Sequence, residues 1–105
     1  MKQQNNKTQK QAVLVVVNMQ SKHISQQGLY DITLSLVDKT RQEPACLEYN
    51  CYSSIDDDSV MEVILFENVD GHQTHMNSPH VLAFQAKYQA LDLQYAVQRV
   101  GYTQN

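Results

Sequence analysis

The sequence predicts an α+β domain with a four-stranded antiparallel sheet, and three observations support this fold class. Apolar and β-branched residues gather in four short runs, which is typical of strands. Apolar residues at helical spacing follow the first run and the third. The resulting order, strand-helix-strand-strand-helix-strand, is the ferredoxin-like β-α-β-β-α-β pattern.

The first half of the chain holds two predicted strands and one predicted helix. Residues 12–17, Ala-Val-Leu-Val-Val-Val, predict the first strand. Ser25 is a suitable N-cap for a helix that runs to about Gln42. Glu43-Pro44 ends that helix, because the residue before a proline disfavours helical backbone. Residues 46–53 predict the second strand.

The second half begins with a hairpin turn at residues 56–59, Asp-Asp-Asp-Ser. The turn lacks the alternating oxygens and the distal Glu of a calcium-binding EF-hand loop. Residues 60–66 predict the third strand, and Asp70 is expected to cap a short helix. Ser78-Pro79 then starts another helix, and residues 95–102 predict the last strand. The apolar residues of that helix predict its buried face: Val81, Phe84, Tyr88 and Leu91.

Length and composition predict one domain preceded by a polar arm. The chain has 105 residues, of which 42% are hydrophobic and 18% charged, and these values are typical of a single globular domain. Residues 1–11 are polar and contain several lysines, so we expect a flexible arm there and one domain over residues 12–105. No segment approaches the roughly 20 apolar residues of a membrane span, so no membrane partner is expected.

Charge and cysteine content narrow the classes of partner and compartment. The net charge is −3 and the basic residues are scattered, which argues against a nucleic-acid partner. Cys46 and Cys51 lie in one predicted strand at an odd separation, so we expect them on opposite faces. At about 16 Å apart along the strand they could not form a disulfide. Two free thiols are typical of a reducing compartment, and we expect a cytoplasmic protein.

The strands also predict a partner subunit. A sheet with helices on one face usually alternates apolar and polar residues, because its other face meets water. Residues 13–17 do not alternate, and apolar side chains in residues 61–66 fill both faces. We therefore expect a homodimer in which the sheet of an identical subunit covers the second face.

Three of the four histidines, His72, His75 and His80, fall within nine residues at the junction between the third strand and the last helix. Histidine is the side chain whose ordinary pKa lies near neutral pH, so this segment is where acid–base chemistry is expected. A zinc site made of the three histidines is an alternative. No Cys or His repeat at zinc-site spacing supports it, and we expect no metal.

Over residues 12–102 the chain resembles the antibiotic biosynthesis monooxygenase family, whose members are dimeric α/β-barrels. Three segments carry the resemblance: Glu43-Pro-Ala-Cys-Leu-Glu-Tyr49, Asp58-Ser-Val-Met-Glu-Val-Ile-Leu-Phe66 and His75-Met-Asn-Ser-Pro-His80-Val-Leu-Ala-Phe84. The resemblance implies cofactor-independent oxidation of a small quinol- or anthrone-like aromatic substrate by O₂. The family also includes haem-degrading proteins and an isomerase of a phosphorylated sugar.

The third strand departs from the family pattern. When the chain is aligned without gaps on His75, the family's usual Trp falls at Phe66 and its usual Glu at Ile64. Glu67 could replace that acid only through a local gap. Two smaller departures are His72 at a normally apolar position and Ala45 in place of a Gly. Haem chemistry is not expected, because Gln85 stands where the haem-degrading members have their histidine.

Oxygenation without a metal or flavin needs a base, a hydrogen bond to the substrate anion and a dry aromatic slot. The resemblance implies that His75 is the base or proton shuttle. As a second catalytic group, His80 is expected either to orient the loop or to line the entrance of the pocket. Asn18 and Tyr49 would bind substrate oxygens, and Phe66 would supply the aromatic wall.

Structural roles for the same residues remain open at this stage. His75 could pack at the helix–sheet junction, Asn18 could simply end its strand, and Phe66 could belong to the core. Two other functions also remain open. One is a non-catalytic ligand-binding or interaction domain of the same fold. The other is an isomerase of a small phosphorylated sugar, although no phosphate-binding Gly-rich loop or Arg pair is visible.

Overall fold

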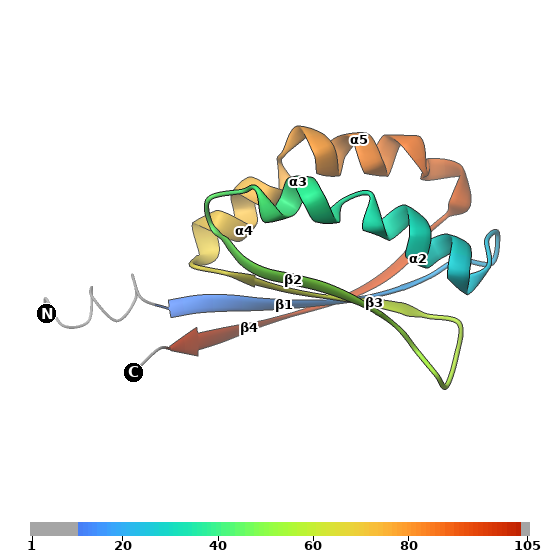
Figure 1. Ribbon diagram of the computed structural model, residues 1–105, viewed down its shortest axis with the longest axis horizontal. Coiled ribbons are helices and arrows are strands. Elements are labelled where there is room, and N and C mark those ends of the chain that lie inside the picture. Colours follow the sequence, from blue (N-terminus) through green and yellow to red (C-terminus); the bar gives the residue numbers. More distant parts are fainter. Residues whose placement is uncertain (1–10, 104–105) are drawn as a thin grey trace, which may run out of the picture.

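The computed structural model describes residues 11–103 and confirms the predicted sheet (Figure 1). The strands are β1 (Gln11–Gln20), β2 (Cys46–Ser53), β3 (Val60–Phe66) and β4 (Gln94–Thr103). They form one antiparallel sheet in the order β2-β3-β1-β4. The helices are α2 (Gln26–Leu34), α3 (Val37–Arg41), α4 (Val69–Met76), α5 (Pro79–Lys87) and the short 3₁₀ helix η1 (Gln89–Leu91). Figure 1 shows the α-helices together on one face of the sheet, while the other face carries none.

Strand alternation decides which side chains meet the helices. On β3, Glu62, Ile64 and Phe66 are buried beneath the helices, and the residues between them face the other way. β1 pairs with β3 and β4, so it lies inside the sheet. The largest cluster of buried apolar residues joins this helix-side face to α3 and α5: Val13, Val15, Leu36, Val37, Tyr49, Ile64, Phe66, Val81 and Phe84.

The prediction of one helix from Ser25 to Gln42 was wrong, because the helix breaks at Ser35. Ser25 does cap α2, and its hydroxyl accepts a hydrogen bond from the backbone N–H of Gly28 at 3.1 Å. At the other end, the Ser35 hydroxyl donates to the carbonyl of Ile32 at 2.5 Å, and the Ser35 N–H donates to the same carbonyl. A serine that competes for a backbone carbonyl favours a tight turn over a continued helix.

Asn68, rather than the predicted Asp70, caps α4. Its side-chain oxygen accepts a hydrogen bond from the N–H of Gly71 at 2.7 Å, while Asp70 lies in the first turn of the helix. Gly71 has a packing role, because a Cβ at this position would lie 2.5 Å from the Cβ of Ala45. α5 begins at Ser78-Pro79 as predicted, but it ends at Lys87, and the predicted helical residue Leu91 lies in η1.

Both cysteines lie on the same face of β2, so the prediction of opposite faces was wrong. Cys46 pairs with Phe66 and Cys51 with Glu62, and these two partners share the helix-side face of β3. The reason is a register shift between Cys46 and Glu48, which adds one residue to β2 and reverses the alternation. The thiols are free and half-buried.

The face of the sheet away from the helices carries the second set of apolar side chains that the strand pattern predicted. Leu14, Val16, Met61, Val63 and Leu65 are half-buried there. Their arrangement fits the predicted homodimer, which stays a prediction. None of the helices within residues 11–103 is long and apolar enough to cross a membrane. The predicted arm lies outside the described residues, except that Gln11 begins β1.

Candidate functional site

A cavity of about 250 Å³ lies between the helix-side face of the sheet and helices α4 and α5. Its walls are mainly apolar: Val15, Val17, Met19, Leu36, Ile64, Met76, Val81, Phe84 and Val97. A few side chains with polar groups also line it: Glu62, His72, His75, Gln85 and Tyr95. An apolar cavity with a few convergent polar groups is the usual form of a small-molecule site.

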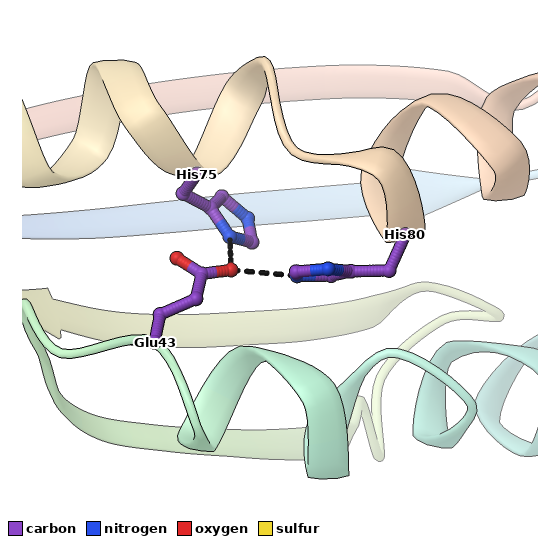
Figure 2. A group of neighbouring side chains, drawn as sticks. All are labelled: Glu43, His75 and His80. Carbon is purple, nitrogen blue, oxygen red and sulfur yellow. Dashed lines mark hydrogen bonds and ion pairs between the residues drawn. The ribbon is translucent and has the colours of Figure 1, made fainter.

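Beside this cavity, Glu43 connects the two histidines of the motif (Figure 2). Its Oε2 lies 2.8 Å from Nδ1 of His75 and 2.6 Å from Nε2 of His80. Glu43 follows α3, while His75 and His80 belong to α4 and α5, so one carboxylate holds three segments together. The side chains are 12% exposed for Glu43, 7% for His75 and 14% for His80.

The bond to Glu43 determines which ring nitrogen of His75 is free. Nδ1 must carry the proton in order to donate to the carboxylate, so Nε2 of the neutral ring is an acceptor. Nε2 has no hydrogen-bond partner among residues 11–103, and the side chain lines the cavity. A carboxylate behind a histidine fixes the tautomer and stabilises the cation that forms when Nε2 takes up a proton.

His72 lies beside His75 on α4, with ring centroids 6.5 Å apart. Burial, the charge of Arg99 and His75 lower the pKa of His72 below its ordinary value. Arg99 approaches from β4, with its Nη1 3.4 Å from Nδ1 of His72, which fits an acceptor nitrogen on a neutral ring.

The ligand atoms of Glu43, His75 and His80 all lie within 4.8 Å of one another, so these residues are the candidate metal ligands of the described chain. Oε2 of Glu43 lies at hydrogen-bond distance from both ring nitrogens, which is the geometry of a carboxylate that accepts from two N–H groups. In this structure the three groups therefore form a hydrogen-bonded cluster. His72 contributes no ligand atom to it.

Glu62 is the site residue that the sequence interpretation missed. It lies on β3 two residues before Ile64, where the family's acid was expected, and alternation places both on the same face. The hydroxyl of Tyr49 donates to Oε2 of Glu62, and Glu62 itself is only 6% exposed. Burial raises the pKa of Glu62, and the bond from Tyr49 opposes that rise. A charged residue on the buried face of an alternating strand was the signal that could have revealed it.

Glu62 influences the titratable groups around it. Burial and then the charge of Glu62 raise the pKa of Cys51 to about 11. The same two causes raise the pKa of Tyr95, which lines the cavity. Both side chains therefore carry the influence of the carboxylate of Glu62.

The structure brings one of the five predicted site residues, His75, to the cavity wall. His80 bonds to Glu43 outside the lining. Asn18 is exposed and lies on the opposite face of the sheet, because it alternates with the buried Met19. Tyr49 is buried and reaches the cavity only through Glu62.

Phe66, the fifth predicted residue, is fully buried beneath the histidines. Its ring centroid lies 5.4 Å from that of His72 and 5.2 Å from that of His75. The ring therefore supports the two imidazoles from the sheet and is not part of the cavity lining.

Comparison with known proteins agrees with this fold and this motif. The model of the antibiotic biosynthesis monooxygenase family matches residues 12–87. Similar solved structures include protein SO0527 from Shewanella oneidensis, with TM-score 0.76 and 22% identity over 88% of this chain and 91% of that one. Rv0793 from Mycobacterium tuberculosis has TM-score 0.78 and 21% identity over 90% and 97% of the two chains.

A candidate antibiotic biosynthesis monooxygenase from Deinococcus radiodurans has TM-score 0.73 and 17% identity over 89% of this chain and 92% of that one. No curated protein matches the chain. At these identities the solved structures show the shared fold, and the family model shows the membership. The chain belongs to the antibiotic biosynthesis monooxygenase family.

Proposed function

We propose that the protein is a cofactor-independent monooxygenase that oxidises a small quinol- or anthrone-like aromatic substrate with O₂. The observation that carries this proposal is the apolar cavity lined by His75, whose Nδ1 is held by Glu43 and whose Nε2 has no partner within residues 11–103. A general base needs a free acceptor nitrogen, a fixed orientation and a group that stabilises its protonated form. His75 has all three.

The proposed reaction uses the substrate as the electron donor. His75 removes a proton, and the resulting electron-rich anion reduces O₂ and combines with it. For an anthrone, the ring CH₂ becomes C=O, and the second oxygen atom leaves as water with the two hydrogens of the CH₂. The apolar walls exclude water from the anion, which strengthens each hydrogen bond made to it.

The positions of the other polar groups change two roles that the sequence predicted. Tyr95 and Gln85 line the cavity and can donate to the substrate anion, the role first expected of Asn18 and Tyr49. His80 shares the carboxylate of Glu43 with His75, so we assign it as a positioning residue. The apolar lining does not favour a phosphorylated sugar, whose phosphate would need cationic or N–H donors.

We also propose that the protein works as a homodimer through the face of the sheet that carries no helix. The half-buried side chains of Leu14, Val16, Met61, Val63 and Leu65 form a continuous apolar surface across β1 and β3. Apolar surface of this kind on an antiparallel sheet is stabilised by burial against a second subunit.

An oxygen electrode tests the proposed reaction with a panel of quinols and anthrones. We expect O₂ uptake with the wild-type chain, and a fall in kcat of about 10²-fold or more for His75→Ala, because a positioned base contributes about that much. His23→Ala is the matched control, because His23 is exposed and does not line the cavity.

The same assay contains the results that contradict the proposal. Turnover unchanged in His75→Ala would remove His75 as the base. No uptake with any member of the panel would favour a ligand-binding domain of the same fold, which has no turnover to lose.

A further inference from the structure

One wall of the cavity carries a carboxyl group that the proposed base does not use. Glu62 projects from the helix-side face of β3, and its Oε2 accepts the hydrogen bond from Tyr49. Oε1 has no hydrogen-bond partner among residues 11–103. The side chain lines the cavity, so a ligand in the cavity would meet an oxygen that lacks a donor. That oxygen is not among the fully buried side-chain atoms without a partner, so it is open to the cavity, where a ligand hydroxyl can donate to it.

Glu62 and His75 lie at different places along the cavity. The ring of His75 packs over Phe66, with centroids 5.2 Å apart. Phe66 follows Glu62 by four positions on the same strand, which corresponds to about 13 Å of extended chain. Between these two rows of the sheet the lining residues are the apolar pair Val15 and Ile64. The cavity therefore offers two polar contacts separated by an apolar stretch, which matches a planar aromatic molecule with oxygens at separate positions.

The charges around Glu62 determine which ligand group can approach it. The titratable groups coupled to it are Tyr49, Cys51 and Tyr95, and each of these is neutral or negative. No Lys or Arg is among the residues that line the cavity, and the nearby Arg99 contacts His72, beside His75 and away from Glu62. A ligand carboxylate at this end would place a second negative charge beside the carboxyl group of Glu62. A phenolic hydroxyl would satisfy the free oxygen of Glu62 without adding charge.

We infer that Glu62 is the residue that anchors the ligand and determines its class: it binds a hydroxyl of a neutral phenolic aromatic and rejects aromatic carboxylates. The inference rests on the proposed use of this cavity as the substrate site. It narrows the proposed quinol- or anthrone-like substrates to those without a carboxylate that carry a hydroxyl away from the atom deprotonated by His75.

Three naphthalenes of similar size test the inference by binding alone, without turnover. They are 2-naphthol, 2-methoxynaphthalene and 2-naphthoate, and binding is measured by calorimetry on the full chain at neutral pH. For the wild-type chain we expect 2-naphthol to bind about tenfold or more tightly than either analogue, because only the hydroxyl both donates and remains uncharged. Equal affinity for 2-naphthol and 2-methoxynaphthalene would overturn the inference.

Two variants of Glu62 separate its hydrogen bond from its charge. Glu62→Leu removes the acceptor, so the preference for 2-naphthol over 2-methoxynaphthalene should disappear. Glu62→Gln removes only the charge, so 2-naphthoate should gain about tenfold in affinity while some of the hydroxyl preference remains. Glu67→Gln is the matched control, because it removes one negative charge from an exposed residue just beyond β3, and all three affinities should stay unchanged.

The outcomes keep this inference distinct from the proposed reaction. A hydroxyl preference retained in Glu62→Leu would overturn the inference, and if that variant does not fold, unchanged 2-naphthoate binding in Glu62→Gln would do so. A Glu62-dependent preference without O₂ uptake would support the inference while the proposed reaction fails. O₂ uptake by Glu62→Leu with an unchanged KM would leave the reaction standing and remove Glu62 from ligand binding.

Discussion

Replacement of Glu43 by alanine should destabilise the protein strongly, although Glu43 lies in no helix or strand. Its Oε2 accepts hydrogen bonds from His75 at 2.8 Å and from His80 at 2.6 Å. Both rings are well buried, with side chains 7% and 14% exposed. The alanine variant would leave the N–H of His75 without an acceptor, at a cost of about 1–3 kcal/mol. It would leave His80 with only the more distant Ser78 hydroxyl, 3.3 Å from its Nε2, at a further cost of about 1 kcal/mol.

A smaller effect works in the opposite direction. Oε1 of Glu43 is buried and has no partner among residues 11–103, so its removal relieves a penalty of about 1 kcal/mol. The expected net loss in the free energy of unfolding for Glu43→Ala is therefore about 1–3 kcal/mol. Glu43→Gln keeps a carbonyl oxygen that can accept from the rings and loses only the charge, so we expect a loss of about 1–2 kcal/mol.

Urea unfolding followed by circular dichroism measures these differences, with every variant at one protein concentration because dimer formation would make stability concentration-dependent. Glu67→Ala is the control, since substitution of an exposed glutamate should change stability by no more than about 0.5 kcal/mol. If Glu43→Ala lost no more stability than this control, the two hydrogen bonds would not hold α3, α4 and α5 together, and the reasoning would be refuted.

Three further changes have defined outcomes. The pKa of His72 is lowered on folding, so its contribution to stability is complete above about pH 6.5 and is lost as the pH falls toward the lowered pKa. His72→Phe should therefore reduce the loss of stability on mild acidification, which is measured as Tm against pH. The pKa of Glu62 is raised on folding, so the wild-type chain loses stability as the pH rises from about 4.3 toward that raised pKa. Glu62→Gln should therefore become more stable relative to the wild-type chain as the pH rises. A difference in Tm between the two chains that does not change with pH would contradict the shift. Val63→Lys places a charge on the sheet face without helices, so sedimentation should show monomers for this variant and dimers for the wild-type chain. A wild-type monomer at micromolar concentration would refute the proposed dimer.

Much of the fold follows from short-range signals in the sequence. β-branched runs predicted the strands, the Ser25 cap and the Ser78-Pro79 start predicted two helix beginnings, and residues 56–59 predicted a hairpin turn. In that turn, Asp57 accepts hydrogen bonds from the N–H and hydroxyl of Ser59. These features could be predicted because each depends on backbone preferences of a few neighbouring residues.

The structure differs from the predicted helices and strands where a single residue changes the local backbone. The hydroxyl of Ser35 breaks the predicted long helix by bonding to Ile32. An extra residue in β2 reverses the faces on which its later side chains lie, so Cys46 and Cys51 share a face. Neither a bulge nor a helix break changes the apolar pattern enough to be predicted from spacing.

The motif with His75 and His80, the order of strands and helices along the chain and the apolar second face of the sheet were all determined by the sequence alone. Only the tertiary structure decided what these histidines contact, because Glu43 lies 32 residues before His75 and 37 before His80. The same holds for Glu62, whose place on the cavity wall depends on how α4 and α5 pack over β3. The physical reason is that a hydrogen bond between distant segments is set by packing of whole elements, and residue spacing along the chain carries no record of it.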